Sequence, residues 1–295
     1  MTEVLDQGID LIHWIEAFRT PALNQFFMLV TDLGSTVGYL LLLPVVWWAF
    51  SWKLGARVFV ALVLSIYLNS LIKDVVALPR PFVYADVQNL RSPGEYSFPS
   101  GHAQQAALFW GLLALHFHHS QRRPWFSVVA AVVIFLVGFS RVYLGVHFPS
   151  DVVAGWVLGA LLAWGTARWS KPLVDKAVGL GLNAQMALSL GLPVGLTLVH
   201  PSANAAMAMG ALAGALGGLV FAYHHGLYPQ GDRARNRRAW LIIGLVGLPI
   251  IYVGLRQLSP GPESAYYHFY LWVRFAAIGL WVSFLVPRLV SWIKA

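Results

Sequence analysis

A histidine and an aspartate four positions apart, His147 and Asp151, have the clearest spacing for chemistry in this sequence. Pro149 lies between them and suits the first turn of a helix. There a carboxylate can accept a hydrogen bond from one ring nitrogen, which fixes the tautomer and leaves the other nitrogen's lone pair free to attack. A second histidine, His102, is available to protonate a leaving oxygen. We therefore predict a nucleophile at His147, held by Asp151, with His102 as the general acid.

Cationic side chains and a helix start accompany these residues. A lysine near a helix end and an arginine on the loop after Pro79 could reach one anion, and a second arginine precedes His147 by six positions. Ser100 is a good N-cap, and the helical turn after it exposes N–H groups at the positive end of the helix dipole, where an anion is favoured. The predicted phosphate-binding residues are Lys73, Arg80, Ser100, Gly101 and Arg141.

The composition places these residues in a membrane protein. The chain of 295 residues is 58% hydrophobic and 11% charged, with a mean hydropathy of +0.65. Such a composition has too few polar residues to cover a surface exposed to water. Zero cysteines exclude disulfides and thiolate sites. Apolar stretches of roughly 20 residues predict an all-α polytopic fold with about nine transmembrane helices, near 36–52, 56–78, 101–119, 124–144, 149–169, 184–200, 203–224, 239–257 and 268–291.

Two shorter segments precede these spans. Residues 7–18 alternate polar and apolar faces at helical period, which is typical of a helix in the membrane interface. Residues 22–33 predict a short apolar helix before Gly34 and Ser35 turn the chain, and together the two segments could form a tenth, partial span. The acidic start is not typical of a cleaved signal peptide.

The distribution of basic residues predicts the orientation, because they collect on the cytoplasmic side. With nine crossings, one face receives thirteen of the twenty lysines and arginines, and the other receives ten of the twelve acids. We therefore expect the N-terminus outside and the C-terminus inside, with the predicted site on the outer face. The net charge of +8 follows from this asymmetry, and the scattered short loops give no footprint for nucleic acid.

Three segments converge on that outer face: residues 73–81, 99–102 and 140–151. Each has an ordinary structural explanation when taken alone, such as a snorkelling lysine or a simple helix cap. Together they place Lys73, Arg80 and Arg141 where cations should be scarce, which indicates a functional site.

The same segments resemble the three-part signature of the type-2 phosphatidic acid phosphatase superfamily. Lys73 is followed after six residues by Arg80-Pro81, then by Pro99-Ser100-Gly101-His102, and then by Ser140-Arg141 with five residues to His147 and three to Asp151. This resemblance implies a phosphohistidine at His147, proton donation by His102 and phosphoryl binding by the five residues named above. It implies no metal and no organic cofactor.

The expected function is an integral membrane phosphatase that hydrolyses a lipid phosphate or pyrophosphate at the outer face. A bacterial inner membrane with the site in the periplasm is the expected location. A lipid phosphotransferase and a sugar-phosphate phosphatase would use the same site, and a non-catalytic lipid transporter or scramblase is the alternative of another class. The expected partners are the lipid phosphate and membrane lipids, and a homo-oligomer is left open.

Three regions are expected along the chain: interfacial helices over 1–34, a catalytic core over 35–170 and a C-terminal transmembrane extension of unknown role over 171–295. In the extension, Gly210, Gly214 and Gly218 recur every four residues, which predicts close helix packing.

Overall fold

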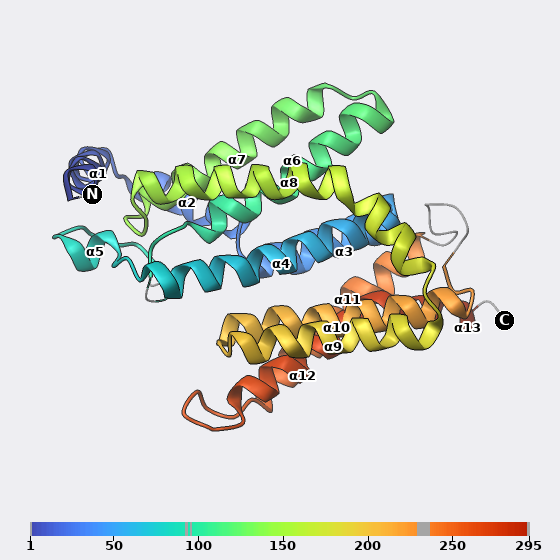
Figure 1. Ribbon diagram of the computed structural model, residues 1–295. Coiled ribbons are helices and arrows are strands. Elements are labelled where there is room, and N and C mark those ends of the chain that lie inside the picture. The colour runs from blue at the N-terminus through green and yellow to red at the C-terminus, as the bar shows by residue number, and fades with distance from the viewer. Residues whose placement is uncertain (1, 92–93, 95, 229–236, 294–295) are drawn as a thin grey trace. The chain divides into compact units, whose positions relative to one another are not determined.

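A computed structural model shows a helical chain and describes all residues except 1, 92–93, 95, 229–236 and 294–295 (Figure 1). The described residues form no strand, as the predicted all-α fold requires. The chain divides into two compact units, which are described separately: residues 1–39 with 68–168, and residues 40–67 with 169–295. The first unit holds all the predicted site residues.

The first unit contains α1 (Thr2–Glu16), α2 (Pro21–Asp32), α5 (Pro81–Tyr84), α6 (Gly101–Gln121) and α7 (Trp125–Tyr143). It also holds the start of α3 (Thr36–Val45), the end of α4 (Trp52–Val76) and most of α8 (Pro149–Val178). The predicted short helix before Gly34 is confirmed as α2. Its first turn has a proline and a capping side chain, because Thr20 Oγ1 accepts from the Leu23 N–H at 3.3 Å.

Helix α1 has apolar side chains on two faces. One face carries Leu5, Ile9 and Ile12, which are buried in the hydrophobic core of the first unit together with side chains that flank the start of α8. Trp14 is 62% exposed and lies on another face. The helical period predicted from the sequence is present, and the contact of α1 with a membrane interface stays a prediction.

Glycines allow α8 to lie close to the start of α6. A Cβ at Gly155 would be 2.6 Å from Ser100 O and 3.0 Å from Ala103 Cβ, and Gly159 faces the carbonyl of Gln104 in the same way. Since backbone atoms lie opposite both glycines, larger residues would separate the two helices. The close approach sets the distance between the second and third motif segments.

The second unit contains α9 (Leu182–Val199), α10 (Ala203–His224), α11 (Arg237–Gln257), α12 (Tyr267–Leu280) and α13 (Val286–Trp292), with π-helical segments at Val46–Phe50 and Trp281–Leu285. Helix α10 contacts α9 and α12 (Figure 1). The predicted role of the α10 glycines is confirmed: added Cβ atoms would meet Trp272 O at Gly210 and Ala276 O at Gly214. Arg233 and Arg235, which nine crossings assign to the more basic face, lie outside the described residues.

Seven helices of the described residues are long and apolar enough to cross a membrane, and the bent pair α2 with Thr36–Phe50 makes an eighth if it counts as one span. The predicted span at 101–119 forms α6 but is not among them, since its histidines and glutamines lower its hydropathy. Each of the nine predicted segments is helical over most of its length in the described part of the chain.

Candidate active site

The three motif segments meet at one end of the first unit, where α4 and α7 end and α6 and α8 begin (Figure 1). Lys73 lies in the last turn of α4 and Arg80 is the N-cap of α5. Ser100 is the N-cap of α6, Arg141 lies in the last turn of α7, and Asp151 lies in the first turn of α8. The backbone joins the second segment to the third, because the Ser100 N–H donates to Asp151 O at 3.0 Å.

The imidazole of His147 lies between a guanidinium and a carboxylate. Its Nε2 is 3.2 Å from Nη1 of Arg80, and its Nδ1 is 3.3 Å from Oδ2 of Asp151. An arginine donates and never accepts, so Nε2 must present its lone pair to Arg80, and this network assigns the proton to Nδ1. The spacing of four residues thus gives the tautomer whose Nε2 carries no proton.

Asp151 is fully buried and is held by more than the histidine. Its Oδ2 accepts the Phe148 N–H at 2.9 Å and the Ser97 hydroxyl at 2.5 Å. The contact with Phe148 closes the first turn of α8, while Ser97 comes from the loop before α6. Two hydrogen bonds besides the contact with His147 therefore hold this carboxylate in place.

Burial lowers the pKa of His147 well below its ordinary value of 6.5, and the positive charges of Arg80, Arg141 and Lys73 lower it further. Water solvates an imidazolium better than this interior does, and the cations repel it. His147 is therefore neutral at pH 7. A neutral imidazole with an unprotonated Nε2 is the form that can attack an electrophile.

The arginines are anchored by backbone and side-chain acceptors. Arg80 donates from Nη1 to Val146 O at 2.7 Å and from Nε to Gly94 O at 2.5 Å. Arg141 donates from Nη1 to Thr31 Oγ1 at 2.5 Å, and Thr31 belongs to α2. Both guanidinium groups are buried. Each keeps further N–H groups that these bonds do not use.

Unused hydrogen-bonding groups gather at this end of the first unit. Six buried side-chain nitrogens or oxygens in the described part of the chain lack a partner, and three of them are Ser100 Oγ, Arg141 Nε and Asp151 Oδ1. Such groups are costly, and each needs an explanation. A bound oxyanion would accept from the Ser100 hydroxyl and the Arg141 guanidinium, which matches the predicted phosphate-binding role.

Lys73 and Gly101 are held in other ways. Lys73 donates to Tyr96 O at 2.6 Å and to Ser97 O at 2.9 Å, so an ammonium group with three protons has one left. At Gly101 a Cβ would lie 3.0 Å from Asn69 Oδ1, which keeps the start of α6 tight against α4.

His102 follows Gly101 in the first turn of α6, and its ring lies beside the break between α2 and α3. A Cβ at Gly34 would be 3.2 Å from Cδ2 of His102. The second predicted histidine thus lies at the same end of α6 as Ser100 and Gly101.

The sequence does not predict several residues that support the site. Asn69, one turn before Lys73, donates to Gln104 Oε1 at 2.8 Å and to Pro99 O at 3.3 Å, and both carboxamides are buried. A polar side chain within an apolar span was the available signal for Asn69. Ser97 had no comparable signal, because it is one serine in a loop.

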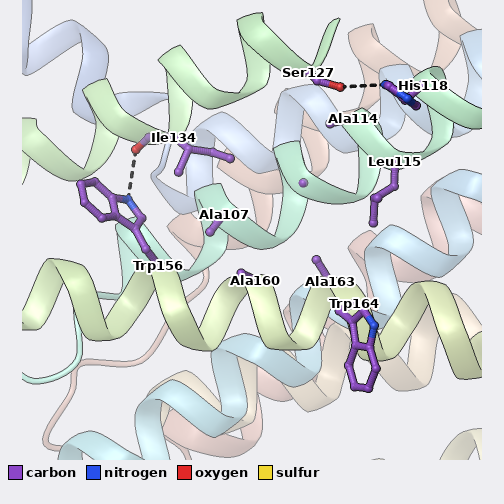
Figure 2. A pocket seen from close by; sticks show the side chains of 11 residues that line it. Ala107, Ala114, Leu115, His118, Ser127, Ile134, Trp156, Ala160, Ala163 and Trp164 are labelled. Carbon is purple, nitrogen blue, oxygen red and sulfur yellow. Dashed lines mark hydrogen bonds between the residues drawn. The ribbon is translucent and has the colours of Figure 1, made fainter. Parts of the chain in front are cut away.

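A groove of about 600 Å³ lies elsewhere in this unit, between α6, α7 and α8 (Figure 2). Small side chains such as Ala107 and Ala160 line it, with His118 and Ser127 among its few polar residues. Trp156 also lines it and donates to Ile134 O at 3.2 Å. The groove contains none of the motif residues.

Comparisons with known proteins identify the family of this chain. Residues 54–175 match the PAP2 superfamily, and residues 206–295 match the family described as PAP2 superfamily phosphatase, transmembrane extension. The chain is 35% identical over 114 residues to the undecaprenyl-diphosphatase of Sulfolobus acidocaldarius, across 38% of this chain and 53% of that protein. It is 32% identical over 154 residues to the phosphatidylglycerophosphatase B of Bacillus subtilis, across 49% of this chain and 73% of that protein.

A solved structure is also similar. The crystal structure of a transmembrane PAP2 type phosphatidylglycerolphosphate phosphatase from Bacillus subtilis aligns with a TM-score of 0.52 and 27% identity, over 58% of this chain and 88% of that one. The present chain thus spans about half the length of the first relative and most of the solved structure.

Proposed function

The chain belongs to the PAP2 superfamily, and from that premise we propose that it is an integral membrane phosphatase that removes phosphate from a lipid phosphate or lipid pyrophosphate through a phosphohistidine at His147. The observation that carries the proposal is the orientation of His147, with Nε2 at 3.2 Å from Arg80 and Nδ1 at 3.3 Å from Asp151. A phosphoryl group that accepted from Arg80 would lie beside Nε2, whose lone pair Arg80 would then release.

The proposed reaction has two displacements. In the first, Nε2 of His147 forms a bond to phosphorus, the bond from phosphorus to the lipid oxygen breaks, and His102 gives its proton to that oxygen. In the second, His102 takes a proton from water, the water oxygen bonds to phosphorus and the P–N bond breaks. Arg80, Arg141 and Ser100 stabilise the charge on the phosphoryl oxygens in both steps.

A lipid substrate is supported by the relatives and by the position of the site. Two relatives are named as phosphatases of undecaprenyl diphosphate and phosphatidylglycerophosphate. In this chain the site residues lie at the ends of helices apolar enough to span a bilayer, where a lipid headgroup would lie and its chain would extend between the helices.

The decisive assay measures phosphate release from a panel of lipid phosphates and pyrophosphates by the purified protein. His147→Gln should abolish turnover. His268→Gln is the matched control, since His268 is an exposed histidine of the second unit. In a His102→Ala variant, a reactive phosphate ester should leave labelled phosphate on His147. Full activity of His147→Gln would refute the mechanism.

Product analysis separates the functions that share the site. Transfer to another acceptor leaves little free phosphate, and a sugar-phosphate phosphatase would release phosphate from soluble sugar phosphates but not from lipids. Movement of lipid without any release would identify a transporter or scramblase. We expect release from lipids that persists in chelator and is blocked by vanadate, which can adopt the five-coordinate geometry of phosphoryl transfer.

We place the site on the outer face, in a bacterial inner membrane facing the periplasm, with the N-terminus outside. The chain has no cysteine, so single cysteines can report topology without background. Gly181 and Gly261 suit this purpose, because a Cβ at either meets nothing within 4 Å. An impermeant thiol reagent applied outside should label Gly261→Cys and not Gly181→Cys. The reverse pattern would place the site on the inner face.

A further inference from the structure

We propose that Ser97 is a positioning residue, whose hydroxyl holds Asp151 and supplies a second acceptor for the Nδ1 proton of His147. This inference rests on the proposed function, because it assigns Ser97 to the orientation of the nucleophile. The Ser97 side chain is fully buried. Its Oγ lies 2.5 Å from Oδ2 of Asp151 and 3.3 Å from Nδ1 of His147.

The hydrogen bonds can be assigned from the number of protons. A serine hydroxyl has one proton, and the Ser97 hydroxyl donates it to Oδ2 of Asp151 at 2.5 Å. The proton of Ser97 therefore goes to Asp151, and Oγ has only lone pairs for His147. Because Nδ1 is also 3.3 Å from Oδ2 of Asp151, its proton is shared between two acceptors at equal distance.

The backbone fixes where this hydroxyl lies. The Ser97 N–H donates to Leu78 O at 2.8 Å, and the Ser97 carbonyl accepts from Lys73 Nζ at 2.9 Å. Leu78 and Lys73 belong to the first motif segment, and His147 and Asp151 belong to the third. Ser97 thus connects the two segments through its N–H, its carbonyl and its hydroxyl.

The two acceptors matter most when charge develops on the imidazole. As Nε2 bonds to phosphorus, the ring becomes cationic, and hydrogen bonds from a charged donor are about twice as strong as neutral ones. Without the hydroxyl, Nδ1 keeps only Asp151, and that carboxylate keeps only the Phe148 N–H as a fixed donor to Oδ2. Ser97→Ala should therefore slow formation of the phosphohistidine.

The expected signature is a loss in kcat rather than in KM. Ser97 Oγ contacts the side of His147 opposite Nε2, so it does not touch the phosphoryl group. Loss of a hydrogen bond to a charged group corresponds to a fall in kcat of about 10- to 100-fold, with KM changed less than about threefold. Ser97→Thr keeps the hydroxyl and should recover most of this loss.

The experiment compares Ser97→Ala and Ser97→Thr with Ser189→Ala in the full-length protein. Ser189 is a buried serine of the second unit whose hydroxyl bonds only within α9, to Met186 O at 2.9 Å. Steady-state kinetics, thermal unfolding and the single-turnover rate of phosphoenzyme formation are measured. A double-mutant cycle with Asp151→Asn should show strongly less than additive losses, because Ser97 acts through that carboxylate.

Three outcomes would overturn the inference. The first is a kcat for Ser97→Ala within twofold of the parent. The second is equal loss in the alanine and threonine variants together with a lowered unfolding temperature, which assigns Ser97 to packing. The third is additivity with Asp151→Asn. Retained turnover in His147→Gln would instead refute the proposed function, so the two failures are distinguishable.

Discussion

The close contact between α6 and α8 at Gly155 allows one added methyl group to test whether helix spacing sets the geometry of the site. A Cβ at this position would lie 2.6 Å from Ser100 O, and real Cβ atoms essentially never come closer than 3.0 Å. In Gly155→Ala the two backbones must therefore separate by about 0.4 Å, since a close-packed interior has no room to absorb the methyl group.

This separation acts on the link between two motif segments. The Ser100 N–H bonds to Asp151 O at 3.0 Å one turn before Gly155, so the movement pulls Ser100, a proposed phosphate-binding residue, away from the carboxylate next to His147. A misplacement of 1 Å can cost on the order of 100-fold in rate, which makes roughly tenfold in kcat the expected loss for a shift of this size. Overpacking should also lower the free energy of unfolding by about 1–3 kcal/mol.

The matched control is Gly111→Ala in the same helix pair. A Cβ at Gly111 would meet only Ala163 Cβ at 3.5 Å, which is an ordinary contact, so its activity and stability should stay close to those of the parent. Both variants are assayed for release of phosphate from a lipid phosphate and for thermal unfolding in the same detergent. If Gly155→Ala is as active as Gly111→Ala, the spacing of α6 and α8 does not set the geometry of the site.

Four further predictions test the electrostatics of the site and the packing of both units. Burial and nearby cations lower the pKa of His147, so Nε2 should stay unprotonated as the pH falls through 6.5. The acid limb of kcat/KM should therefore lie below pH 6.5 once the titration of the substrate phosphate is subtracted. An acid limb above pH 6.5 would contradict it. Below about pH 6.5 the unfolded chain protonates His147 and the folded protein does not, so the free energy of unfolding should fall as the pH is lowered further. Denaturant titrations at several pH values measure this loss. Thr31→Val removes the acceptor of Arg141 Nη1 and should raise KM and the vanadate inhibition constant by about tenfold, with kcat changed less; unchanged values would show that Thr31 does not position the guanidinium. In Gly214→Ala the Cβ meets the backbone oxygen of Ala276, which should destabilise the second unit by about 1–3 kcal/mol in thermal unfolding, while Gly217→Ala, whose Cβ would meet Ser189 Oγ at 3.6 Å, should not.

The sequence predicted the helices because they depend on strong local patterns, and its candidate site residues lie on segments that the structure brings to one end of the first unit. A long apolar stretch is stable in a bilayer as a helix. The packing role of the α10 glycines was predictable because a period of four places them on one face of that helix. The pairing of His147 with Asp151 follows from four residues of spacing at a helix start, and the structure shows it at 3.3 Å.

What could not be predicted depends on contacts between distant segments. Nothing in the sequence joins Ser97 to Asp151 or Thr31 to Arg141, since these contacts span 54 and 110 positions. The packing partners of residues 40–67 were equally inaccessible. They were assigned to the catalytic core with their neighbours in sequence, and in the structure they pack with the C-terminal helices. An apolar helix carries no local signal for which neighbour it contacts.

The residues before the matched segment 54–175 are part of what holds the site in place. Arg19 donates from Nε to Tyr143 O at 3.1 Å and from Nη1 to Gln88 O at 2.8 Å, which fixes the end of α7. Thr31 holds the guanidinium of Arg141 on the last turn of the same helix. For the proposed phosphate binding, the residue must be held at its backbone and its guanidinium at the tip, because a misplacement of the order of 1 Å is costly for phosphoryl transfer. Arg19, in the turn between α1 and α2, and Thr31 of α2 supply both constraints from outside the segment that carries the motifs, so the motifs alone do not determine the geometry of the site.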